Sequence, residues 1–145
     1  MGIRITDKSS DVDFNKLQSF LKTTIWQSEI GANTLRRTID NSLCIFAFDK
    51  DEQVGFARAV SDKATFCWID DVFVDPNYHG LGIGGKMIQA ILEHPELRSI
   101  ASWFLTSSNP EGRKVFSCYG FEPIELARAQ KLMTLPRVQN EHYLS

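Results

Sequence analysis

The residues with the clearest potential for chemistry form a glycine-rich stretch in the middle of the chain. Four glycines, Gly80, Gly82, Gly84 and Gly85, fall within six residues. Glycine lets backbone N–H groups approach a ligand closely, and the amino-terminal end of a helix favours negative charge. The amphipathic pattern that follows is typical of a helix. We therefore predict that this turn and the helix start bind a phosphate-bearing ligand.

The elements on either side of the glycines determine what the turn can reach. An apolar run over 65–74 predicts a central strand, and the helix after the turn is expected over 82–93. A second buried strand is expected at 100–106. It is followed by a helix that begins near Ser107-Ser108-Asn109-Pro110 and stops at Gly120. This strand–turn–helix unit should lie at the centre of the fold.

The rest of the chain supplies further elements around this unit. Ser9 or Ser10 can cap a first helix that runs to about Leu21, and a shorter helix is expected over 34–39. The remaining strands are expected at 2–6, 43–48, 53–61, 121–124 and 129–135. Tight polar turns predict antiparallel neighbours, and the strand–helix–strand unit predicts a parallel pair. The order β-α-α-β-β-β-α-β-α-β-β predicts an α/β (α+β) mixed sheet with helices on both faces.

Length and composition exclude several classes of protein. The 145 residues fit a single domain, residues 1–145. The net charge of −2 gives no reason to expect a nucleic acid or an anionic membrane as a partner. No apolar run approaches the roughly 20 residues of a membrane helix. The three cysteines have no metal-like spacing, which argues against a disulfide framework and against a metal site. A cytoplasmic location is expected.

One interpretation of the glycines is a dinucleotide site, because Gly80, Gly82 and Gly85 match the pattern G-x-G-x-x-G. The context does not fit. In that fold the first glycine follows its strand almost directly, whereas five residues, 75–79, intervene here. The next strand, 100–106, also ends without an acidic residue that could hold a ribose.

Two segments together resemble the GCN5-related N-acetyltransferase (GNAT) superfamily. They are V-D-P-N-Y-H-G-L-G-I-G, from Val74 to Gly84, and N-P-E-G-R-K-V-F-S-C-Y-G-F, from Asn109 to Phe121. The matching positions are Val74 and Pro76 at the strand exit, Gly82 and Gly84 in the turn, and Asn109, Gly120 and Phe121 at the ends of the later helix. The resemblance covers about residues 3–135. It implies an acyltransferase that uses acetyl-CoA (coenzyme A) and transfers the acetyl group to an amine.

The resemblance also implies how the cofactor is held. The pyrophosphate is expected on the glycine turn, and the pantetheine arm on the exposed edge of the central strand. His79 stands where the family prefers Arg or Gln, so Lys86 can supply the charge, and His79 is alternatively a solvated loop residue. The expected cofactor-binding residues are Val72, Phe73, Val74, His79, Gly80, Leu81, Gly82, Ile83, Gly84, Gly85, Lys86, Asn109 and Phe116.

The catalytic groups are less well defined by the resemblance. Many members use a tyrosine four residues before the Gly-Phe pair to protonate the departing thiolate, and this position is Phe116. Tyr119 is the available tyrosine, with a core aromatic as the alternative role. Adjacent residues of a strand face opposite sides, so only one of Asp70 and Asp71 should face the acceptor. We predict Asp71 as the catalytic carboxylate beside the amine.

The acceptor site in this superfamily lies near the first two helices and the strand ends. Candidate substrate-binding residues there are Trp26, Glu29, Trp68 and Trp103. The chain has no long basic or acidic groove, which favours a small-molecule amine over a protein N-terminus or a lysine. A non-catalytic acyl-CoA-binding sensor is the alternative from another class, because Phe116 replaces the usual tyrosine. The sequence is also compatible with a homodimer.

Overall fold

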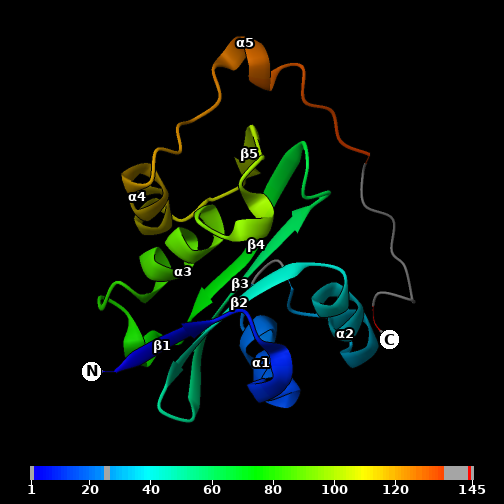
Figure 1. Ribbon diagram of the computed structural model, residues 1–145. Helices are drawn as coiled ribbons and strands as arrows, with labels where there is room; N and C mark the ends of the chain where they lie inside the picture. Colours follow the sequence, from blue (N-terminus) through cyan, green and yellow to red (C-terminus); the bar gives the residue numbers. More distant parts are fainter. Residues whose placement is uncertain (1, 25–26, 136–143, 145) are drawn as a thin grey trace.

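The computed structural model describes residues 2–24, 27–135 and 144, and its centre is a five-stranded sheet (Figure 1). The strands lie in the order β1-β2-β3-β4-β5. They are β1 (Ile3–Thr6), β2 (Leu43–Asp49), β3 (Glu52–Ser61), β4 (Phe66–Val74) and β5 (Ser102–Leu105). The first four pair antiparallel, and β5 pairs parallel with β4. The predicted mixed sheet is therefore confirmed.

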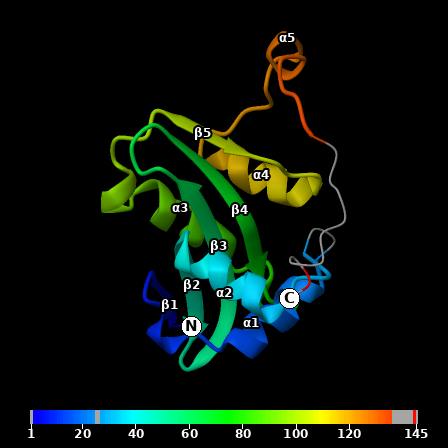
Figure 2. The same cartoon turned by 90° about the vertical axis from the view of Figure 1, so that its right-hand side faces the viewer.

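Helices cover both faces of the sheet (Figure 2). On one face lie α1 (Phe14–Lys22) and α2 (Ala32–Asp40), and on the other lie α3 (Ile83–Leu92) and, packed on it, α4 (Pro110–Cys118). β2 is buried on both sides because its side chains alternate between two apolar clusters. Leu43, Ile45 and Ala47 join the α3 cluster, and Cys44, Phe46 and Phe48 join the cluster of α1 and α2. Cys44 and Cys67 are free, buried cysteines of the two clusters.

The first helix begins later than the sequence suggested. Asp13, and not Ser9 or Ser10, is the N-cap of α1, and its carboxylate accepts a hydrogen bond from the Lys16 amide at 3.0 Å. Ser9 and Ser10 belong to a separate 3-10 turn, Ser9–Asp11. Serine and aspartate are both favoured at the N-cap position, so residue type alone could not choose among the three.

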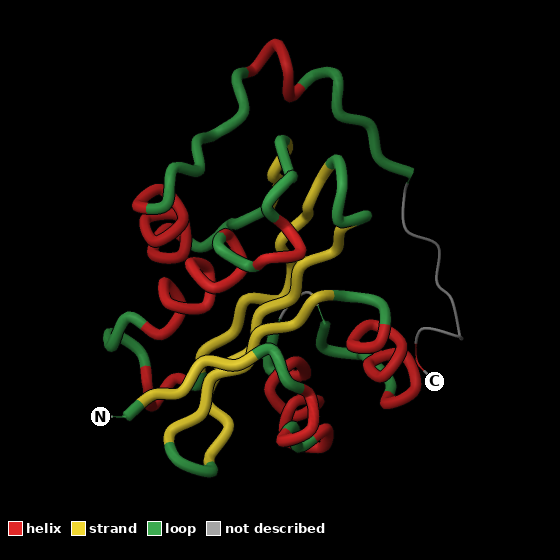
Figure 3. The backbone as a smooth tube through the Cα atoms, viewed as in Figure 1, coloured by secondary structure: helices red, strands yellow, loops and turns green. Residues whose placement is uncertain are grey.

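The predicted closing pair of strands is wrong. Within 121–135 the structure has one short helix, α5 (Leu126–Ala129), and no strand among the described residues. This segment rises away from the sheet in an arch (Figure 3). Its apolar side chains are largely exposed, 75% for Leu126 and 90% for Met133. The apolar pattern that suggested strands is local, whereas a strand forms only where a neighbouring strand pairs with it.

The contact between the sheet and α3 leaves no room for a side chain at Gly55. A Cβ built there would lie 3.1 Å from both the Ala47 Cβ and the Met87 methyl carbon. We therefore expect Gly55→Val to lower the free energy of unfolding by about 1–3 kcal/mol through overpacking. Urea unfolding checks this. The control is Gly84→Ala, whose Cβ would meet nothing nearer than a Val74 methyl at 3.7 Å. Equal stabilities for the two variants would contradict the packing.

No helix in the described part of the chain combines the length and the apolar character that crossing a membrane requires.

Candidate active site

A bulge near the end of β4 brings two carboxylates to the same face of the sheet. β3 advances two residues from Phe56 to Arg58, whereas β4 advances three between their partners Phe73 and Asp70. Asp71 absorbs the extra residue with φ 54°, in the left-handed region. The strand alternation is lost there, so the expectation that Asp70 and Asp71 face opposite sides is wrong.

Arg58 of β3 joins the two carboxylates. Its Nη2 lies 2.8 Å from the Asp70 Oδ2, and its Nε lies 2.9 Å from the Asp71 Oδ2. Its Nη1 donates to the Ser42 hydroxyl at 3.1 Å. Gln27, which precedes α2, donates from Nε2 to the Asp71 carboxylate at 3.2 Å. The guanidinium thus neutralises one of two neighbouring negative charges.

The two carboxylates differ in exposure. The side chain of Asp71 is 2% exposed, and that of Asp70 is 38% exposed. Burial, together with the charge of Asp71, raises the pKa of the Asp70 carboxyl above its usual range, although Arg58 opposes this. Asp70 is therefore the carboxylate that an incoming ligand can reach, with an affinity for protons above that of a free aspartate.

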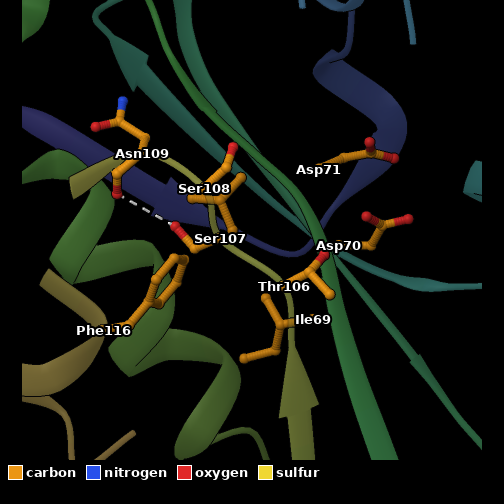
Figure 4. A pocket seen from close by; sticks show the side chains of 9 residues that line it. Ile69, Asp70, Asp71, Thr106, Ser107, Ser108, Asn109 and Phe116 are labelled. Carbon is orange, nitrogen blue, oxygen red and sulfur yellow. Dashed lines mark hydrogen bonds between the residues drawn. The ribbon is translucent and has the colours of Figure 1, made fainter. Parts of the chain in front are cut away.

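A cavity opens where β4 and β5 part. The two strands pair only from Phe66–Ser102 to Ile69–Leu105, so the edge of β4 beyond Ile69 has no strand partner on that side among the described residues. The cavity has a volume of about 470 Å³. It is lined by the bulge, by the residues that follow β5 and by one aromatic ring of α4 (Figure 4): Ile69, Asp70, Asp71, Val72, Thr106, Ser107, Ser108, Asn109 and Phe116.

A second groove continues from this cavity to the glycine turn. It has a volume of about 370 Å³ and is lined by Val74, by His79 to Gly85 except Leu81, and by residues of α3 and α4. Val72, Asn109 and Phe116 line both spaces. The carboxylates of the bulge and the glycine turn therefore lie at opposite ends of one continuous cleft.

The glycine turn leads directly into a helix, α3, as the sequence predicted. Gly80 and Gly82 adopt φ of 78° and 77°, which side chains strongly disfavour, and Gly82 is the N-cap of α3. The first intrahelical bond is donated by the Lys86 amide to the Gly82 carbonyl. The amides of Ile83, Gly84 and Gly85 precede it and have no partner within the helix. They form a donor cluster at the positive end of α3.

The remaining cofactor candidates occupy distinct positions. The His79 Nε2 donates to the Val74 carbonyl at 2.8 Å, which leaves Nδ1 for other partners. Leu81 and Lys86 are exposed beside the turn. The ring of Phe73 stacks on Phe20 of α1, with centroids 4.8 Å apart, so only its backbone faces the cleft side of β4.

Asn109 joins the two parts of the cleft. It is the N-cap of α4, and its Oδ1 accepts from the Glu111 amide at 2.9 Å. The Ser107 hydroxyl lies 3.5 Å from its carbonyl oxygen. The side-chain amide nitrogen of Asn109 is thus available to a ligand.

The candidate substrate-binding residues do not gather in one place. Trp68 lies on the face of the sheet that carries Asp70, whereas Trp103 packs against the core beneath α3 on the opposite face. Glu29 is exposed. Trp26 lies outside the described residues.

Comparison with known proteins decides the family. Residues 13–121 match the sequence model of the acetyltransferase (GNAT) family. The chain belongs to this family. A GNAT-family protein from Xanthomonas campestris pv. campestris is 32% identical in sequence, with a TM-score of 0.85, and the match covers 100% of this chain and 99% of that one. The protein is therefore an acyltransferase with the fold that its sequence predicted.

More distant structures share the fold of this acetyltransferase. The ribosomal-protein-S18-alanine N-acetyltransferase from Escherichia coli is 16% identical, with a TM-score of 0.70, over 86% of this chain and 80% of that one. The glucosamine-6-phosphate N-acetyltransferase from Arabidopsis thaliana is 11% identical, with a TM-score of 0.69, over 97% of this chain and 100% of that one. The same fold thus occurs in enzymes named for a protein acceptor and for a sugar acceptor.

The acetyltransferase has an apolar ring, Phe116, at the position where the family resemblance implied a tyrosine. Phe116 lines both parts of the cleft. Tyr119 lies one turn further along, and its hydroxyl oxygen would be 3.0 Å from a Cβ at Gly85. Its ring packs on α3 and the core, which favours the structural alternative.

This packing leads to a prediction for Tyr119→Phe. We expect kcat/KM to stay within about threefold of the wild-type value, because the ring contacts with α3 are kept. Steady-state kinetics with acetyl-CoA checks it, and Tyr119→Ala, which removes the ring, should lower the melting temperature. A fall of about 100-fold or more in the phenylalanine variant, with unchanged stability, would instead identify Tyr119 as the general acid.

Proposed function

We propose that this acetyltransferase transfers the acetyl group of acetyl-CoA to a primary amine of a small molecule, and that residues 1–145 form one catalytic domain. The observation that carries the proposal is the continuous cleft from the amide cluster of α3 to the carboxylates of the β4 bulge. An anionic, extended donor fits the first end, and an amine fits the second.

The donor would lie along the cleft from α3 to the bulge. Its pyrophosphate meets the amides of Ile83 to Gly85 and the positive end of the helix, with Gly80, Leu81, Lys86 and His79 around it. The amides of its pantetheine arm pair with the edge of β4 from Val72 to Val74, as an added strand would. The support for this placement is that β5 has already left that edge. Asn109 donates to the same arm.

The amine would attack the thioester carbonyl beside the bulge. A C–N bond forms, the carbonyl oxygen becomes an oxyanion that a β4 backbone N–H stabilises, and the C–S bond then breaks to release coenzyme A. The nitrogen loses its proton as the bond forms. Asp70 is placed to receive it, because Asp70 is accessible whereas the Asp71 carboxylate is held by Arg58 and Gln27. Direct catalysis by Asp71 stays a prediction.

The departing thiolate needs no side-chain acid in this mechanism. Phe116 offers no proton, and the thiolate of coenzyme A is a weak enough base to leave unprotonated. Water in the open cleft can protonate it afterwards. The sensor alternative rests on this same absence of a hydroxyl at Phe116.

The small-molecule acceptor is the finer part of the proposal. It is supported by the size of the cavity at the bulge, about 470 Å³, which matches a small ligand. A protein N-terminus or lysine remains the alternative acceptor, because the shared fold serves both classes.

Turnover of acetyl-CoA across a panel of primary amines tests the proposed function. Free thiol is followed spectroscopically, and the acetylated amine is identified by mass spectrometry. We expect amine-dependent thiol release that falls at least about tenfold in Asp70→Asn. Tight binding of acetyl-CoA without release of thiol on any amine or peptide would favour the sensor. Acetylation of peptides alone would favour a protein acceptor.

A further inference from the structure

A row of apolar side chains remains accessible on the sheet face that carries Asp70. Val60 stands opposite Trp68, and Trp68 stands opposite Phe104. Residues in register across neighbouring strands share a face, so these three side chains form one cross-strand row. Phe66, two residues before Trp68, extends the row. Val60 is 36% exposed and Phe66 is 41% exposed.

None of these residues belongs to the core. The apolar cluster beneath α1 and α2 takes its sheet residues from β2 and from Phe56 of β3. Among the described residues, α1 and α2 therefore leave the β4–β5 end of this face uncovered. Trp68 and Phe104 stack on each other, with ring centroids 6.0 Å apart and an interplanar angle of 21°. Val60, Phe66, Trp68 and Phe104 make a flat apolar surface, called here the aromatic platform.

The platform adjoins the proposed reaction centre. Asp70 follows Trp68 by two residues on the same face, which corresponds to about 7 Å along a strand. Thr106 follows Phe104 by two residues, and it lines the cavity together with Asp70. The platform is thus continuous with the cavity, and a carboxylate lies between them.

We propose that the aromatic platform binds the body of the acceptor, and that the acceptor is an arylalkylamine, a primary amine joined to a flat aromatic group by a short alkyl linker. This inference rests on the proposed function. Asp70 attracts the amine at one end, and the stacked rings hold the aromatic group at the other. A linker of two or three carbons spans the separation between Trp68 and Asp70.

The chemistry of the platform favours an acceptor whose amine is attached to a flat apolar group over one with an alkyl or a sugar group. Aromatic pairs contribute favourable ring contacts beyond the burial of their area. A small alkylamine reaches Asp70 but leaves the platform in water. A polyhydroxylated sugar would have to give up its hydration at a surface whose four members offer one indole N–H and no hydroxyl.

Kinetics with matched amines tests the platform. We expect kcat/KM for 2-phenylethylamine to exceed that for n-propylamine by about tenfold or more. A tenfold ratio corresponds to about 1.4 kcal/mol of additional binding by the ring. In Trp68→Leu and Phe104→Leu the ratio should fall below about threefold, mainly through KM, with the Kd for acetyl-CoA unchanged. Leu126→Ala is the control, because Leu126 is an exposed apolar residue of α5 and lies outside every part of the cleft.

Calorimetry on the coenzyme A-loaded protein separates the platform from the catalytic proposal. Tighter binding of 2-phenylethylamine than of n-propylamine, lost in Trp68→Leu, supports the platform even if no amine is acetylated. In that case only the proposed function fails. Equal turnover of the two amines, unaffected by Trp68→Leu, overturns the platform and leaves the acetyltransferase intact. Equal or undetectable binding of both amines with no turnover overturns both.

Discussion

Replacing Gly84 by aspartate should raise the Kd for acetyl-CoA by about 100-fold or more, while the protein remains folded. Gly84 is the second residue of α3, where the amides of the first turn have no partner within the helix. A carboxylate at this place would compete for those amides and would repel the pyrophosphate. About 2.7 kcal/mol, the equivalent of 100-fold in affinity, is a modest loss for a charge placed directly against a dianionic group.

The structure makes Gly84 a sharper test site than Gly82. Gly82 has φ of 77°, so any side chain there strains the turn, and lost binding could reflect lost structure. At Gly84 the nearest atom to a new Cβ is a Val74 methyl at 3.7 Å. Gly84→Asn is the matched control, because it has the same size without the charge. Calorimetry should show a far smaller loss of affinity for acetyl-CoA in Gly84→Asn than in Gly84→Asp. If Gly84→Asp left the affinity for acetyl-CoA unchanged, the pyrophosphate could not bind at this turn.

Replacing Arg58 by methionine should lower the free energy of unfolding by about 3–5 kcal/mol. The methionine fills a similar volume but leaves the 2%-exposed Asp71 side chain without its charged partner. Asp70 would lose the same partner. Removing one member of a buried ion pair costs more than the pair contributes, since an uncompensated charge stays behind. Chemical denaturation of the purified variant measures the effect.

An exposed ion pair provides the control for Arg58. Lys63 lies 2.9 Å from Glu96, and both side chains are more than half exposed. Lys63→Met should therefore lower the free energy of unfolding by less than about 1 kcal/mol. Asp71→Asn in the Arg58→Met background should recover part of the stability, because it removes the buried charge. Similar losses for Arg58→Met and Lys63→Met would show that the carboxylate pair is solvated and free of the guanidinium.

The local backbone at the proposed donor end could be predicted from the sequence. The positive φ of Gly80 and Gly82 and the helix start at Ile83 follow from glycine spacing and local propensity, which act over a few residues. The cap of α4 at Asn109 is equally local. These features are determined by neighbours in the chain, so they can be recognised without the fold.

The acceptor end could not be predicted in the same way. A single-residue bulge changes the face of Asp71 and has no compositional signature. One signal was present, since Arg58 lies within an apolar strand and a buried guanidinium requires acidic partners. Phe104 was missed because its role depends on the register between β4 and β5, which only the assembled sheet defines. The prediction of two strands within 121–135 was wrong for the same reason, since strand pairing is not a local property.

A crystal structure with acetyl-CoA bound would show directly how the cleft holds the donor. We expect the pyrophosphate on the amides of Ile83 to Gly85, the pantetheine arm along the free edge of β4, and the thioester carbonyl in the cavity beside Asp70. We also expect Phe116 against the sulfur end of the arm and the aromatic platform open beyond the acetyl group. A donor bound elsewhere, or a thioester pointing away from the β4 bulge, would contradict the proposed binding mode.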